Sequence, residues 1–104
     1  MESIKRTQDF NDLMCDSFNK PVLIDYYADW CGPCKKIKPA IKELACNTPC
    51  VKFAKLNIEN FEKITEGERV SCLPTFILYH KGKEVDRVEG ASLRKVTDMV
   101  KHSR

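Results

Sequence analysis

Residues 30–34 read Trp-Cys-Gly-Pro-Cys and lie directly between an apolar run and a helical pattern. The apolar run, residues 22–27, is typical of a buried central strand. Two cysteines three positions apart at a strand-to-helix junction are typical of a redox motif. The chain is therefore expected to fold as an α/β domain in which Cys31 and Cys34 form a disulfide that closes and reopens.

Apolar periodicity predicts the remaining elements. We expect an edge strand at 3–6, a first helix around 10–18, a long helix after the cysteines, a core strand at 51–58, a short helix at 61–66, a strand at 75–79, its hairpin partner at 84–88 and a last helix capped by Ser92. Gly67 is expected to cap the short helix, and Pro39 to kink the long one without ending it. Phe18, Val85 and Leu93 are expected to be apolar core positions. The order predicts a mixed five-stranded central sheet flanked by four helices on both faces.

Length and composition limit the class of protein. The 104 residues suffice for one domain, residues 1–104, and 42% of them are apolar, which suits a packed core. The net charge of +3 comes from 18 basic and 15 acidic residues, a balance too even for a nucleic-acid partner. No stretch has the length of a signal-peptide core or a membrane span. We therefore expect a cytoplasmic protein whose six cysteines are free thiols apart from one cycling pair.

Position assigns different roles to the two cysteines. Cys31 is expected at the first turn of the helix, where unpaired backbone N–H groups favour a thiolate, so it would be the nucleophile. Cys34 lies one turn further in, is expected to be more covered, and would be the resolving thiol. Gly32 allows the turn, and Pro33 fixes φ at the start of the helix, a rigid pair that favours a reductant. Trp30 would shield one side of the sulfurs.

A zinc site and a purely structural disulfide are the two other interpretations of the cysteine pair. A zinc site needs two further ligands, but Cys46 lies 15 residues after Cys31, about 22 Å along a helix, and His80 and His102 lack metal-ligand spacing. A purely structural disulfide would close too small a loop to constrain the unfolded chain much. Neither is favoured, and no metal is expected.

Asp25 interrupts the most apolar stretch of the chain. Burying a carboxylate is costly and should raise its pKa, so in a strand that leads to the cysteines Asp25 is a candidate proton acceptor for Cys34. The alternative is an ordinary aspartate at a frayed strand end. Lys55, on the neighbouring predicted strand, is a candidate partner of Asp25 or else a surface lysine. Lysines 35, 38 and 42 share one helix face, which is expected to be solvated and modestly to favour acidic partners.

Taken together, these residues resemble the thioredoxin family over essentially the whole chain. The resemblance is carried by Asp25, residues 28–35 (Ala-Asp-Trp-Cys-Gly-Pro-Cys-Lys), residues 55–58, residues 73–76 (Leu-Pro-Thr-Phe), the Lys-Gly pair at 81–82 and Gly90. It implies a thioredoxin fold and a general protein disulfide reductase. A thioredoxin-like binding module with secondary redox chemistry is the alternative. An isomerase-type domain is disfavoured, because it usually carries a histidine in the motif.

The resemblance also implies a client-docking surface. The Leu73–Pro74 bond would be cis, with Pro74 beside the sulfurs and the backbone of Leu73 pairing with the client as an added strand. Trp30 and Gly90, together with Gly32 and Pro33 of the motif, would complete this surface.

Partners follow from the resemblance as well. No cofactor would be bound; NADPH would act indirectly, through thioredoxin reductase. Implied clients are ribonucleotide reductase, peroxiredoxins and methionine sulfoxide reductases. The protein would be mostly monomeric, with Cys72 available for regulation or a disulfide-linked dimer. Cys46 and Cys50 are expected to be semi-buried thiols or, under oxidation, a second disulfide.

Overall fold

The centre of the protein is a mixed sheet with the strand order β1-β3-β2-β4-β5. In the computed structural model, which describes residues 1–103, the strands are β1 (Glu2–Ser3), β2 (Val22–Tyr27), β3 (Lys52–Asn57), β4 (Thr75–His80) and β5 (Lys83–Glu89). β3 runs parallel to β2 and to β1, whereas β4 runs antiparallel to β2 and to β5. The predicted five-stranded mixed sheet is confirmed.

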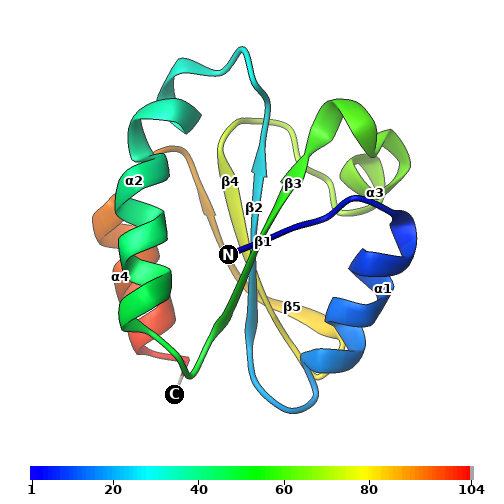
Figure 1. Cartoon of the computed structure of the whole chain (residues 1–104), viewed down its shortest axis with the longest axis vertical. Helices are drawn as coiled ribbons and strands as arrows, with labels where there is room; N and C mark the ends of the chain where they lie inside the picture. The colour runs from blue at the N-terminus through cyan, green and yellow to red at the C-terminus, as the bar shows by residue number, and fades with distance from the viewer. Residues whose placement is uncertain (104) are drawn as a thin grey trace.

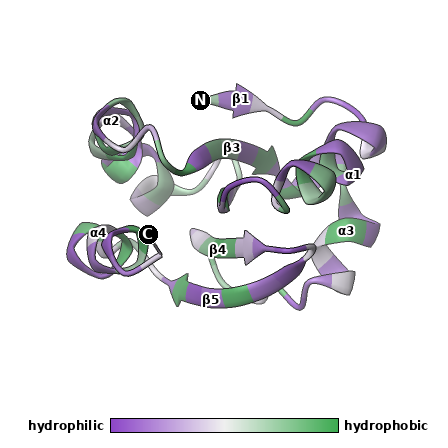
Figure 2. Ribbon diagram, turned by 90° about the horizontal axis from the view of Figure 1, so that it is seen from below, coloured by the Kyte–Doolittle hydropathy of each residue, from purple (hydrophilic) through white to green (hydrophobic). Residues whose placement is uncertain are grey.

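Four α-helices cover the sheet, as predicted (Figures 1 and 2). They are α1 (Thr7–Asp16), α2 (Gly32–Asn47), α3 (Glu62–Gly67) and α4 (Leu93–Lys101), and the 3-10 turn η1 (Ile58–Asn60) precedes α3. α2 and α4 pack on one face of the sheet, and α1 and α3 on the other. No helix within residues 1–103 is long and apolar enough to cross a membrane.

Alternation along β2 divides the core between the two faces. Leu23 packs under α2 and α4, while Ile24 and Tyr26 pack under α1 and α3. Each is at most 1% exposed, and burying one such side chain contributes about 2 kcal/mol. Asp25 takes the next position on the Leu23 face, so the strand places a carboxylate beneath α2.

Three apolar residues expected in the core lie at the surface instead. Val85 is 50% exposed because the ladder skips it: Leu78 pairs with Asp86 and Tyr79 with Glu84, which leaves Val85 as the extra residue of a bulge. Phe18 is 63% exposed because α1 ends two residues earlier. Leu93 opens α4 and is 41% exposed. The edge strand is also shorter than predicted, residues 2–3 instead of 3–6.

α3 ends differently from the prediction. Gly67 lies inside the helix, and Arg69 has the left-handed conformation, with φ of +56°. The N–H groups of Arg69 and Val70 donate to the carbonyls of Glu66 and Thr65, at 3.0 and 3.1 Å. This pair of bonds is a Schellman motif, which needs a positive φ two positions after Gly67. The sequence predicts Gly67 as the residue with positive φ that ends the helix. In the structure, the hydrogen-bond pattern places Arg69 at that position.

Candidate active site

The two cysteines of the motif are bonded to each other at the start of α2. Cys31 is the N-cap residue, and its sulfur accepts the backbone N–H of Cys34 at 3.2 Å. Gly32 and Pro33 form the exposed first helical positions between them. A sulfur at a helix N-terminus that accepts a backbone N–H is placed to carry negative charge once the disulfide is reduced.

Burial does not distinguish the two cysteines. Cys31 is 5% exposed and Cys34 is 6% exposed, so the expectation that Cys34 is more covered is wrong for the disulfide form. What differs is the space that each cysteine lines. Cys31 lines an outer groove together with Trp30, whereas Cys34 lines an inner cavity together with Asp25.

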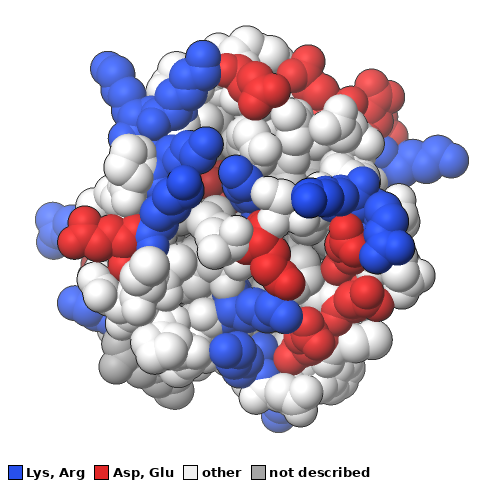
Figure 3. Space-filling view, in the orientation of Figure 1, with Lys and Arg blue, Asp and Glu red and all other residues white. Residues whose placement is uncertain are grey.

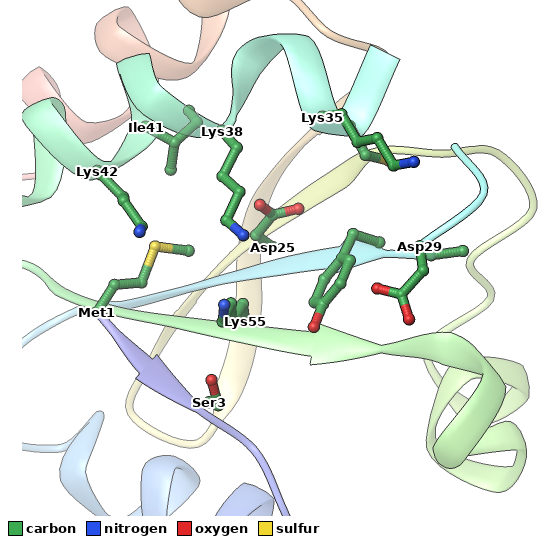
Figure 4. Close-up of a pocket in the computed structure, with 12 residues that line it drawn as sticks. Met1, Ser3, Asp25, Asp29, Lys35, Lys38, Ile41, Lys42 and Lys55 are labelled. Atoms are coloured by element: carbon green, nitrogen blue, oxygen red, sulfur yellow. The ribbon is translucent and has the colours of Figure 1, made fainter. Parts of the chain in front are cut away.

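The inner cavity, of about 310 Å³, lies between α2, β2 and β3 (Figure 4). Asp25 is only 7% exposed, and its buried Oδ1 has no hydrogen-bond partner within residues 1–103. Burial raises the pKa of Asp25 from 3.8 to about 7, although the charges of Lys55 and Lys38 oppose the rise. A carboxyl group with that pKa can both accept and return a proton near neutral pH.

Lys55 lies opposite Asp25 in the β2–β3 register. It makes no ion pair within 4.0 Å with Asp25 among the described residues; its ammonium lies 5.8 Å from the centre of the Tyr27 ring instead. Burial, followed by the charges of Lys38 and Lys42, lowers the pKa of Lys55. Lys55 therefore acts on Asp25 through the electrostatic field of its charge rather than through a direct contact.

Lys38 belongs to this cavity as well, which sequence analysis did not recognise. Its side chain reaches from α2 toward Asp25 (Figure 4), and Figure 3 shows basic side chains gathered on the α2 side of the molecule. The signal was present in the spacing. Lys38 follows Cys34 by four residues, so the two share one helix face.

The outer groove has a volume of about 420 Å³. Its walls are residues 30–33, Ile58 and residues 70–73. Trp30 is 67% exposed and Leu73 packs against the two cysteines and Ala28, so an apolar surface surrounds the disulfide. An extended client segment would fit along such a groove.

The Leu73–Pro74 bond is cis, as the family resemblance implied. Pro74 is buried, and its carbonyl accepts the N–H of Gly90 at 2.8 Å. Gly90 has φ of +102°, a conformation that is unfavourable for residues with a side chain. Neither the N–H nor the C=O of Leu73 has a partner within residues 1–103, so both are free to pair with an added strand.

The other four cysteines, Cys15, Cys46, Cys50 and Cys72, are free and exposed. The expectation of semi-buried thiols at Cys46 and Cys50 is therefore wrong. Cys72 lies in the outer groove, where its carbonyl accepts the Thr75 hydroxyl at 2.6 Å. Among the described residues, no three His, Cys, Asp or Glu side chains are grouped to hold a metal ion.

A disulfide at a helix N-terminus, with an apolar groove on one side and a buried carboxyl on the other, defines a thiol–disulfide oxidoreductase. The sequence model of the thioredoxin family matches residues 2–102. The chain belongs to the thioredoxin family, and it is a protein-disulfide oxidoreductase.

Similarity to individual proteins supports this family membership. The chain is 34% identical to thioredoxin of Geodia cydonium, covering 97% of this chain and 96% of that protein. It is 39% identical to thioredoxin of Chlamydia caviae, covering 86% and 85%. The solved structure of Fasciola hepatica thioredoxin superimposes with a TM-score of 0.95 at 32% identity, covering both chains fully. The match spans 63% of the mitochondrial thioredoxin-2 of Schizosaccharomyces pombe, at 37% identity.

Membership settles the general chemistry. Thioredoxins exchange electrons through their own cysteine pair and need no bound cofactor. NADPH acts through a reductase, and disulfide-containing proteins are the clients.

Proposed function

We propose that this chain acts as a single-domain general disulfide reductase with a divided active site, in which Cys31 attacks the client from the outer groove and Cys34 resolves beside Asp25. The observation that carries the proposal is that the two cysteines line different spaces. Trp30, Leu73, Pro74 and Gly90 form the client surface. Gly32 and Pro33 hold the turn.

In the first step, the Cys31 thiolate attacks one sulfur of the client disulfide. A bond forms between Cys31 and the client, the client S–S bond breaks, and the leaving client thiolate takes a proton from solvent. The hydrogen bond from the Cys34 N–H to the Cys31 sulfur, at 3.2 Å, favours the attacking thiolate.

In the second step, Asp25 accepts the proton of Cys34, and the resulting thiolate attacks the Cys31 sulfur. The Cys31–Cys34 bond forms, and the mixed disulfide breaks to release the second client thiolate, which takes a proton from solvent. Two electrons have then passed from the dithiol to the client, and the protons are exchanged through solvent and Asp25. The fields of Lys38 and Lys55 favour the carboxylate form of Asp25 that this step requires.

Capture of clients by Cys34→Ser tests this division of roles. The variant keeps the nucleophile but lacks the resolving thiol, so mixed disulfides through Cys31 should persist until dithiothreitol is added. Mass spectrometry of the captured proteins is expected to identify ribonucleotide reductase, peroxiredoxins and methionine sulfoxide reductases of the cytoplasm. The double variant Cys31→Ser/Cys34→Ser is the matched control. Equal capture by the control would contradict the assignment of Cys31.

A cytoplasmic location is part of the proposal and is tested by the same capture. Four exposed free cysteines suit a reducing compartment better than an oxidising one. Relatives include mitochondrial and chloroplast proteins, so clients from one organelle alone would overturn this location.

Cys72 is proposed to link two otherwise monomeric copies under oxidation. The thiol is exposed in the outer groove, so a Cys72–Cys72 disulfide would cover the client surface of both copies. With hydrogen peroxide as the oxidant, two thiols give one disulfide and two waters. Non-reducing electrophoresis is expected to show a dimer in the wild type and in Cys46→Ser, but only monomer in Cys72→Ser. A dimer that persists in Cys72→Ser would assign the link to another cysteine.

A further inference from the structure

A line of hydrogen bonds, buried at one end and half-buried at the other, crosses the face of the sheet opposite Asp25. The hydroxyls of Tyr26 and Tyr79 lie 2.7 Å apart, and Tyr79 donates to Oε1 of Glu68 at 2.6 Å. Because the single Tyr79 proton goes to the carboxylate, Tyr26 must donate to Tyr79. The two tyrosines are at most 1% exposed, and burial raises the pKa of both hydroxyls, so they stay neutral.

Arg87 of β5 binds the same end of α3. It donates to the carbonyls of Glu68 and Arg69 at 2.7 and 3.1 Å, where a helix leaves acceptors without partners. Glu84 accepts two further hydrogen bonds from the guanidinium, at 2.7 and 2.9 Å, and fixes its orientation. We call Tyr26, Tyr79, Glu68 and Arg87 the α3 anchor.

The α3 anchor holds a strained residue next to the outer groove. Arg69 has φ of +56°, which disfavours a residue with a side chain. Arg87 binds the carbonyl of Arg69, and Tyr79 binds the side chain of Glu68 just before it. The next four residues, 70–73, are one wall of the groove and end at the free backbone groups of Leu73.

We infer that Arg87, acting with Glu68 and the tyrosine pair, positions residues 70–73 for client docking. The inference rests on the docking groove of the proposed function. A client strand can pair with Leu73 only where the N–H and C=O of Leu73 are held in place, and the wall that carries them is attached to the α3 anchor. None of the anchor side chains touches the reacting sulfurs. The α3 anchor therefore acts only through residues 70–73, which form one wall of the groove.

The test compares Arg87→Met with Lys83→Met, which removes from the same strand an exposed basic residue that makes no ion pair within residues 1–103. Reduced protein is mixed with increasing insulin, and the fluorescence of Trp30, the single tryptophan, reports the reaction. The insulin concentration at half-maximal rate should rise about 5-fold in Arg87→Met, because two hydrogen bonds from a charged donor are lost. The maximal rate and the rate of Cys31 alkylation by iodoacetamide should stay within about 2-fold of wild type. Lys83→Met should match wild type throughout.

Two further variants keep the result decisive. Tyr79→Phe keeps the ring and removes one hydroxyl, and it should shift insulin dependence in the same direction. Arg87→Lys keeps the charge and should give an insulin concentration at half-maximal rate between those of the wild type and Arg87→Met. If Arg87→Met does not fold, a rise in this concentration in Arg87→Lys supports the inference and no rise overturns it. Unchanged insulin dependence, or an equal loss of alkylation rate, would overturn the inference. A wild-type protein that does not reduce insulin would instead contradict the proposed function.

Discussion

Replacing Cys31 with serine is expected to lower the rate of insulin reduction by about 10³-fold or more. Serine can still occupy the N-cap position, but its hydroxyl stays protonated at neutral pH and cannot attack a disulfide. The remaining Cys34 lines the inner cavity and is not among the residues that line the groove. Turbidity of precipitating insulin chains, with NADPH and thioredoxin reductase as the electron source, measures the loss.

Cys15→Ser is the matched control, because it removes an exposed cysteine from α1. Its activity should equal that of the wild type. Activity in Cys31→Ser above one tenth of wild type would show that another thiol performs the attack.

Replacing Asp25 with asparagine is expected to change both stability and rate. The pKa of Asp25 is 3.8 when exposed and about 7 in the fold. Well below pH 3.8 the carboxyl is protonated in folded and unfolded chains alike. Between pH 4 and 7 only the unfolded chain releases the proton, so the free energy of unfolding of the wild type falls by up to about 4 kcal/mol as the pH rises. Asp25→Asn should lack this fall, which urea unfolding of the oxidised protein at pH 4 and pH 8 measures.

The same substitution should slow insulin reduction by about 10- to 100-fold at pH 7, because the proton acceptor of Cys34 is lost. The wild-type rate should rise through pH 7 as Asp25 ionises, and the variant should lack that inflection. Lys55→Met provides the comparison: removal of a nearby positive charge should move the inflection to higher pH without abolishing it. An inflection that survives unchanged in Asp25→Asn would remove Asp25 from the proton transfer.

Much of the site could be predicted from the sequence because its signals are local. The apolar run of β2, its interruption at Asp25 and the cysteine pair all lie within residues 22–34. Helical spacing also places Lys38 on the same face as Cys34, although the spacing of lysines 35, 38 and 42 by itself favours a solvated face. Local patterns of this kind determine which face of an element a residue occupies.

Features that depend on pairing between distant segments could not be predicted. The exposure of Val85 arises from a bulge, which is visible only once β5 is registered against β4. Tyr26 and Tyr79 both occupy predicted strands, yet their hydroxyls bond to each other across 53 residues, and Tyr79 donates to Glu68, which follows α3. The equal burial of Cys31 and Cys34 depends in part on packing from Leu73, which comes from a distant segment.

The separation of the outer groove from the inner cavity has a consequence for turnover. A client bound along Trp30 and Leu73 covers the side of the disulfide that Cys31 lines. The Asp25 cavity opens elsewhere, between the exposed lysines of α2 and the half-buried Lys55 of β3. Water can therefore exchange protons with Asp25 while the client is still attached, so completion of the reaction does not have to wait for the products to dissociate.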